Sequence, residues 1–352
     1  MLTQPKAKIA IQSKAGETSF SAAPGERLLY AGLAHGLTLP YECATGTCGS
    51  CRARVMEGSV ENLWPEAPGA AAAKLKADKG DVLLCQCRAA TDCVVRVPAN
   101  VVPATAGPLP VKRTARIDVA RRLTHDVIHL ELELSVPMSF EAGQFAVIEH
   151  ADIKGGRAWS MVNHGDELRR LAFVVKRKPG GAFGDWLFDS DVTGAEVTVF
   201  GPLGRAVWRP SEARDILAIA GGSGIAGMMA ILDHATRAGH FAGHRGHVFF
   251  GVRTRADTFY MAELADYVAR AGGNLEVTVL LSHEEVPSGT TIDGINLASG
   301  FVHEVARNSM SGRYGDLTAF LAGPGPMVDG AIRMLLVDAK LTPDRIRYDK
   351  FA

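Results

Sequence analysis

The chain has 352 residues, of which 47% are hydrophobic and 22% charged, and this is enough for two or three globular domains. Its 38 basic and 38 acidic residues cancel, and no long basic run stands out. We therefore expect it to bind neither nucleic acid nor a membrane surface. The opening residues "MLTQPKAKIAIQ" contain no apolar segment of signal-peptide length, so we expect a cytoplasmic protein.

One uncharged stretch, 216–232, raises the question of a membrane span. Its length is at the short limit for crossing a bilayer, and glycines interrupt its middle. We therefore predict a buried strand, a tight turn and a buried helix in this stretch.

The chain divides into three blocks and a linker. Residues 1–100 hold all six cysteines, and residues 101–112 form a proline-rich linker without hydrophobic periodicity. Residues 113–209 contain strand-like alternation, as in "DVIHLELEL", which predicts an antiparallel β-barrel or sandwich, and we take the barrel as the prediction. Residues 210–352 alternate apolar runs, such as "DILAIAGG" and "GHVFFGV", with helical stretches, which predicts an α/β doubly wound parallel sheet.

The densest chemical signal is the segment "YECATGTCGSCRARV". Three cysteines spaced C-x4-C-x2-C, with a distant fourth, match the plant-type [2Fe–2S] pattern. Gly46 and Gly49 tolerate positive φ and let backbone amides approach a cluster closely. The candidate ligands are Cys43, Cys48, Cys51 and Cys85.

Two alternatives compete with the cluster. A zinc site formed by Cys48, Cys51, Cys85 and Cys87 would leave Cys43 and both glycines without a role. Such a module on a flavin-free scaffold would be a binding protein and not an enzyme. Buried free cysteines would make the clustering a coincidence.

The segments "PYECATGTCGSCRARVMEG" and "VLLCQCRA" resemble a plant-type ferredoxin domain, which implies a β-grasp (α+β) fold. The resemblance implies Cys85 as the fourth ligand, although Cys87 competes on spacing alone, and we expect Cys93 in the core. Residues 1–100 carry eleven Lys/Arg and nine Asp/Glu. This block is therefore not a strongly acidic ferredoxin, which favours a tethered module over a free carrier.

A flavin site is indicated by "RAWS" at residues 157–160, followed by Gly180 and Gly181 before an amphipathic segment. Together they resemble the FAD signature of the ferredoxin–NADP reductase superfamily. The resemblance implies that Arg157 holds the diphosphate, that Trp159 stacks on the isoalloxazine in place of the usual tyrosine, and that Ser160 is the catalytic residue near N5. Lys176, Gly181 and Ala182 would lie along the flavin tail, and Phe351 would cover the other flavin face or act as a simple hydrophobic plug. The FAD residues implied are Arg157, Ala158, Trp159, Ser160, Val174, Val175, Lys176, Gly181, Ala182, Phe183 and Phe351.

A nucleotide site is indicated by "IAGGSGIAGMMAIL", which contains a literal G-x-G-x-x-G. A Rossmann fingerprint needs an acid about twenty residues later, and none is there. The motif instead resembles the glycine-rich turn of the reductase superfamily, with Gly227 in place of its proline, and "AGPGPM" resembles its later proline-rich turn. The coenzyme residues implied are Gly222, Ser223, Gly224, Arg253, Ser282, Glu284, Gly323, Pro324 and Met327.

Coenzyme choice depends on the residues after "VTVLL". NADP-specific relatives carry a serine–arginine pair there, whereas this chain has Ser282, His283, Glu284 and Glu285. Two carboxylates would repel a phosphate dianion, so NADH is the expected coenzyme. The positive charges of Arg253 and Arg255 would instead favour the extra phosphate of NADPH.

The three blocks in this order resemble the reductase components of multicomponent bacterial oxygenases, such as methane, toluene or phenol monooxygenase and benzoate dioxygenase systems. The resemblance implies electron transfer from NADH to FAD, to the cluster and to a terminal oxygenase partner, with a lean towards a diiron hydroxylase. A Rieske dioxygenase as acceptor and a stand-alone flavin or ferredoxin reductase are the alternatives. We expect a monomer.

Overall fold

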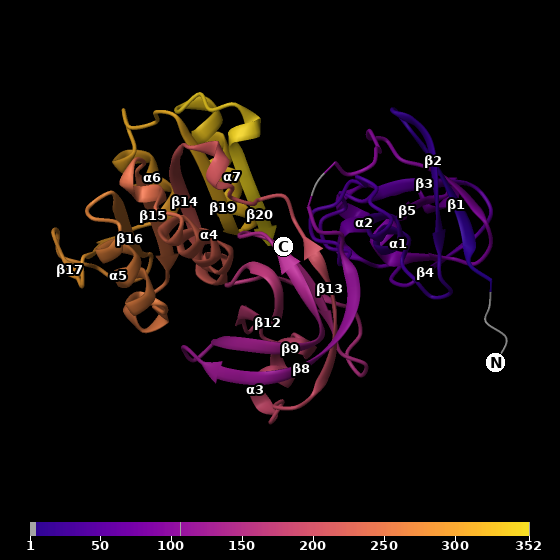
Figure 1. Cartoon of the computed structure of the whole chain (residues 1–352), viewed down its shortest axis with the longest axis horizontal. Coiled ribbons are helices and arrows are strands. Elements are labelled where there is room, and N and C mark those ends of the chain that lie inside the picture. The colour runs from indigo at the N-terminus through magenta and orange to yellow at the C-terminus, as the bar shows by residue number, and fades with distance from the viewer. Residues whose placement is uncertain (1–4, 106, 352) are drawn as a thin grey trace.

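The computed structural model describes residues 5–105 and 107–351, the last of these by its backbone alone. Three large sheets follow one another along the described residues, and each forms its own lobe in Figure 1; β4 and β6 add a two-stranded sheet to the first lobe. None of the helices in the described ranges is long and apolar enough to cross a membrane.

The first lobe combines a mixed sheet with a short helix. Its elements are β1 (Ala7–Ser13), β2 (Gly16–Ala22), α1 (Leu28–Ala34), β3 (Arg52–Glu57), β4 (Val60–Asn62), α2 (Pro68–Ala72), β5 (Asp81–Leu83), β6 (Cys87–Ala89) and β7 (Cys93–Arg96). Five strands pair in the order β2-β1-β7-β3-β5, with β1 and β7 parallel. Alternation in β1 places Ile9 and Ile11 in the core, and α1 packs into the same core. The predicted α+β fold is confirmed.

The second lobe is an antiparallel barrel. Its elements are β8 (Val111–Arg122), β9 (Val127–Phe140), β10 (Phe145–Glu149), β11 (Arg157–Ser160), β12 (Gly165–Lys176), α3 (Ala182–Asp189) and β13 (Glu196–Leu203). The strands pair in the order β11-β10-β13-β8-β9-β12. The amide of Val162 donates to the Ala172 carbonyl at 2.7 Å, and Met161 pairs with Phe173, so the two ends of the sheet meet. The predicted barrel is confirmed.

The third lobe is a seven-stranded sheet covered by helices. Its elements are β14 (Asp215–Gly221), α4 (Ile225–Arg237), β15 (Gly246–Val252), α5 (Met261–Arg270), β16 (Leu275–Leu281), β17 (Thr291–Ile292), β18 (Ile295–Ser299), α6 (Val302–Ser309), β19 (Leu317–Pro324), α7 (Gly325–Val337) and β20 (Ile346–Phe351). The strand order is β17-β18-β16-β15-β14-β19-β20, parallel except for β17. The stretch 216–232 forms a buried strand, a turn and a buried helix, as predicted.

The order of the parallel strands reverses at β14. Strands β15, β16 and β18 continue on one side of β14, and β19 and β20 lie on the other. Ligands of open α/β sheets bind beyond the carboxyl ends of the strands at such a switch point. Two core clusters, one on each face, confirm the doubly wound architecture.

Part of the predicted linker, residues 101–112, is hydrogen-bonded to the first lobe. Thr38 and Val102 bond to each other through their backbones at 2.9 Å, and Ala104 donates to the Gly36 carbonyl. The first third of the predicted linker is therefore attached to the first lobe, and β8 begins at Val111, before the predicted end of the linker. Apolar side chains at Val101 and Val97 hold it there, although the sequence shows no periodicity. The domain boundaries themselves stay a prediction.

Candidate functional site

The cysteine loop curls around its own sulfur atoms. The amides of Thr45, Thr47 and Cys48 each point at the Cys43 sulfur from 3.4 Å. A hydrogen bond from the Cys48 thiol, opposed by burial, lowers the pKa of the Cys43 thiol and so favours the thiolate. Gly46 has φ +93° and Gly49 has φ +84°, as predicted for a loop that turns this sharply.

The four candidate ligands form two pairs. The Cys51 and Cys85 sulfurs lie 3.2 Å apart, and the Cys43 and Cys48 sulfurs each accept from the other residue's amide, at 3.4 and 3.5 Å. A tetrahedral zinc site needs all its sulfurs about 3.8 Å apart. No three cysteine sulfurs, all of which lie in the described ranges, come within 4.8 Å of one another. Two pairs fit the two irons of a [2Fe–2S] cluster and do not fit one zinc ion.

Cys87 and Cys93 lie outside this arrangement. Cys87 is fully buried, and its sulfur is 3.9 Å from the Leu84 carbonyl oxygen. Burial raises the pKa of the Cys87 thiol, which opposes the thiolate form that a metal ligand needs. Cys93 lies 3.3 Å from the Ser59 carbonyl oxygen, on β7. The structure thus pairs Cys85, and not Cys87, with Cys51.

Strand β11 presents the four residues "RAWS" at the edge of the barrel. The Arg157 guanidinium is half-buried, and burial lowers its pKa. It donates to the Gly156 carbonyl at 3.0 Å, and no carboxylate in the described part of the chain pairs with it. A desolvated cation without a partner is suited to an anionic ligand, and a diphosphate fits it.

The other predicted flavin residues come from β12 and the start of α3. The Trp159 ring meets the Phe183 ring edge-on, with centroids 5.1 Å apart, so β11 and α3 are in contact. Val174 and Val175 are buried and can offer a ligand only their backbone. Gly181 is the N-cap of α3, directly before Ala182. The side chain of Phe351 lies outside the described part of the structure, and its backbone ends β20.

A cleft of about 600 Å³ lies at the switch point of the third sheet. Predicted coenzyme residues at the carboxyl ends of four strands line it: Gly222, Ser223, Arg253, Ser282, Pro324 and Met327. Gly222 has φ +54°, and a Cβ on Gly224 would lie 2.2 Å from the Ala322 oxygen. The glycine turn therefore permits a close approach of β19, although Gly224, Gly323 and Glu284 are not themselves in the lining.

Two residues predicted from the sequence lie in unexpected surroundings. Lys176, predicted for the flavin tail, lines the nucleotide cleft beside Gly222 and is 3.4 Å from the Asp126 carboxylate. Glu284 accepts the Arg255 amide at 2.7 Å and lies 3.6 Å from the guanidinium of the same residue.

The arginines that argued for NADPH are both neutralised. Arg253 pairs with Asp126 at 2.8 Å and with Asp257 at 3.1 Å, and Arg255 pairs with Glu284. An extra phosphate that approached either arginine would have to compete with these carboxylates, which favours NADH at this position.

Sequence reasoning missed several residues at the site. Phe301 is 55% exposed yet lines the nucleotide cleft, and the glycine before it was the only local signal. Tyr30 and Tyr41 join the cysteine loop to the barrel, and their roles depend on contacts with residues more than a hundred positions away.

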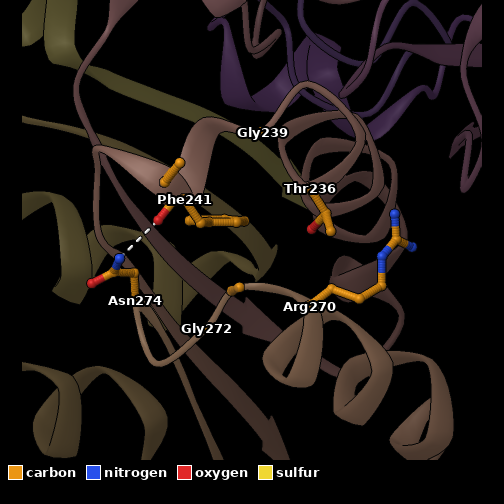
Figure 2. A pocket seen from close by; sticks show the side chains of 8 residues that line it. Thr236, Gly239, Phe241, Arg270, Gly272 and Asn274 are labelled. Atoms are coloured by element: carbon orange, nitrogen blue, oxygen red, sulfur yellow. Dashed lines mark hydrogen bonds between the residues drawn. The ribbon is translucent and has the colours of Figure 1, made fainter.

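A second hollow, of about 330 Å³, lies at the opposite edge of the sheet, before β15 and β16. Figure 2 shows Thr236 and Phe241 on one side of it and Arg270 and Asn274 on the other, with the Asn274 amide donating to the Phe241 carbonyl at 2.8 Å. None of the predicted site residues lines this hollow.

Three family models match consecutive parts of the chain. A 2Fe-2S iron-sulfur cluster binding domain matches residues 11–90, an oxidoreductase FAD-binding domain matches 114–208, and an oxidoreductase NAD-binding domain matches 218–332. The three predicted cofactors, a [2Fe–2S] cluster, FAD and NADH, are confirmed by these matches.

Whole-length relatives have the same organisation. The ferredoxin–NAD(+) reductase component of the alkene monooxygenase system of Xanthobacter autotrophicus is 36% identical, over 95% of this chain and 98% of the relative. The ferredoxin–NAD(P)(+) reductase CarAd of Metapseudomonas resinovorans is 33% identical, over 96% and 98%. The solved structure of a ferredoxin reductase in carbazole 1,9a-dioxygenase superposes with a TM-score of 0.83 at 31% identity, covering 99% of this chain and 100% of the other.

Proposed function

This chain belongs to the family of ferredoxin–NAD(P)+ reductase components of multicomponent oxygenase systems, and from that premise we propose that its acceptor is the terminal oxygenase of a monooxygenase system. The reductase takes electrons from NADH through FAD and a [2Fe–2S] cluster. Each NADH gives NAD+, a proton and two electrons, so two one-electron transfers to the acceptor complete a turnover.

The observation that carries the proposal is the position of Ser160 between the other two sites. On one side its Cβ lies 3.5 Å from where a Cβ on Gly227, in α4, would be. Ser160 also pairs with Phe145 of the neighbouring strand β10, and Phe145 and Ala158 both pack against the core of the ferredoxin lobe. The flavin strand thus contacts both the coenzyme lobe and the cluster lobe.

A bound flavin accepts both electrons of a hydride and releases them singly, which matches a two-electron donor to a one-electron cluster. We assign Arg157 to the diphosphate, Trp159 to a face of the ring and Ser160 to a hydrogen bond with it. These residues bind and orient, and none has to act as a general acid or base.

The cleft residues have matching roles on the coenzyme. The amides of Gly222 and Ser223 are suited to the pyrophosphate, because they open a turn before α4. Phe301 offers an exposed flat ring to the adenine. Glu284 and Arg255 lie outside the lining, and we assign the Glu284 carboxylate to disfavouring the extra 2′-phosphate of NADPH.

The choice of a monooxygenase acceptor is supported by the relatives, since the 36% identical one serves an alkene monooxygenase system. We propose a diiron hydroxylase as the partner, with the reductase as a cytoplasmic monomer. The test is reconstitution: purified reductase, NADH and either a diiron hydroxylase component or a Rieske oxygenase component, with product formation measured per NADH. Coupled turnover with the Rieske component alone would overturn the choice.

A further inference from the structure

Two tyrosines join the cysteine loop to the flavin barrel. Tyr41 stands two residues before Cys43 and accepts a 3.0 Å hydrogen bond from the amide of Gly204, which directly follows β13. Its ring meets the Phe145 ring edge-on, with centroids 6.4 Å apart. Phe145 is the cross-strand partner of Ser160. A packed path therefore leads from the flavin strand to the first cluster ligand.

Tyr30 makes the complementary contact. Its ring stacks on Phe200 of β13, with centroids 4.0 Å apart and planes 7° from parallel, while its hydroxyl donates to the Ala44 carbonyl at 3.2 Å. Arg27 donates to the same hydroxyl at 2.8 Å and pairs with Glu149 of β10 at 2.5 Å. Tyr30 thus holds the loop at the residue after Cys43.

The geometry points to Tyr30 and Tyr41 as positioning residues that fix the Cys43 end of the cluster loop against the flavin strand. The inference rests on the proposed function, because the distance matters only if electrons pass from flavin to cluster. Each transfer moves one electron from reduced flavin to oxidised cluster, and no bond to either tyrosine forms or breaks. Both rings are held in place by packing, so the hydrogen bonds of the hydroxyls fix the exact position of the loop relative to the barrel.

The two hydroxyls hydrogen-bond to opposite ends of the contact between the loop and the barrel. Tyr41 bonds to the barrel through its hydroxyl, and Tyr30 bonds to the loop through its hydroxyl. Removing either hydroxyl leaves the aromatic packing in place but frees one end of the link. Electron transfer between two fixed groups slows as the distance between them grows, so a displaced loop should slow cluster reduction.

The experiment compares Tyr41→Phe and Tyr30→Phe with the wild-type holoprotein in anaerobic stopped flow. NADH is mixed with oxidised protein, and flavin reduction and cluster reduction are followed at separate wavelengths. We expect cluster reduction to slow severalfold, with flavin reduction unchanged. Tyr314→Phe is the matched control, since its hydroxyl contacts Met334 in the third lobe.

Two further readouts separate positioning from general damage. In Tyr41→Phe, hydrogen exchange of the Gly204 amide should accelerate by about fivefold, because its acceptor is gone. The cluster potential should not change, because neither hydroxyl bonds a sulfur. Faster Gly204 exchange with unchanged cluster reduction in both variants would overturn the inference. Failure of NADH to reduce the cluster in the wild-type protein would instead overturn the proposed function.

Discussion

The ring of Tyr30 lies flat on the ring of Phe200, with centroids 4.0 Å apart. This contact joins the cores of two lobes, although the two residues are 170 positions apart in sequence. Both side chains are at least 94% buried. The ferredoxin lobe therefore packs against the barrel through a shared hydrophobic core, in addition to its covalent connection through the linker (Figure 1).

Loss of this stack should destabilise the protein. We expect Phe200→Leu to lower the free energy of unfolding by about 1–3 kcal/mol, because the stacking and some buried area are lost. Urea denaturation followed by circular dichroism measures it. Val136→Ala, at an exposed position, should stay within about 0.5 kcal/mol of wild type. Equal effects for the two variants would contradict the docking role.

The fourth cluster ligand can be tested by two cysteine substitutions. Cys85→Ser should abolish the cluster, since Cys85 is the partner of Cys51, whereas Cys87→Ser should retain full iron content. Iron analysis and electron paramagnetic resonance of the dithionite-reduced protein measure the outcome, and flavin content serves as the folding control. Retention of the cluster in Cys85→Ser with its loss in Cys87→Ser would reverse the assignment.

The glycine turn of the third lobe leaves no room for a side chain at one position. Gly224→Ala should weaken NADH binding by about tenfold or more, since its Cβ would lie 2.2 Å from the Ala322 oxygen and push β19 away. Gly227→Ala is the control, because its Cβ meets nothing nearer than 3.5 Å. Titration calorimetry with NADH measures both. Equal affinities would show that the close approach is not needed.

Coenzyme preference should respond to the Glu284–Arg255 pair. Glu284→Gln removes the carboxylate that neutralises Arg255, so we expect kcat/KM for NADPH relative to NADH to rise by about tenfold. The exposed neighbour Glu285 provides the matched control, Glu285→Gln, with a smaller change. An equal rise of this kcat/KM ratio in both variants would mean that the overall charge of the loop, and not the Glu284–Arg255 pair, determines coenzyme preference.

Acid should weaken the contact between the barrel and α4, where the His234 ring stacks on the His164 ring with centroids 4.4 Å apart. Burial, together with His164 and Arg237, lowers the pKa of His234, while Asp233 and Glu141 oppose the shift. The unfolded chain therefore binds a proton below pH 6.5 more readily than the folded one, and stability falls as the pH drops through that value. His234→Gln should reduce the loss of Tm between pH 7.5 and 5.5 by about 1–3 °C. His125→Gln, at an exposed position, should not.

Local sequence patterns predict the fold of each lobe and most of the candidate site residues. They do not predict the contacts between lobes. Gly46 and Gly49 were predicted from the demand for a sharp loop, and Cys85 from its spacing and context. Lys176 was assigned to the flavin tail, but a residue at the end of β12 also faces the turn after β14, and the sequence carries no signal for that packing. The sequence carries no signal for the roles of Tyr30 and Phe301 either, because their partners come from elements that only the fold brings together.

Electron transfer from NADH to both bound cofactors can be tested by an anaerobic absorbance titration of the purified protein with NADH, and with NADPH in a parallel cuvette. We predict flavin and iron–sulfur bands that bleach with NADH and only slowly with NADPH. A colourless protein that contains zinc would contradict this prediction, because neither the flavin nor the cluster would be present to carry electrons.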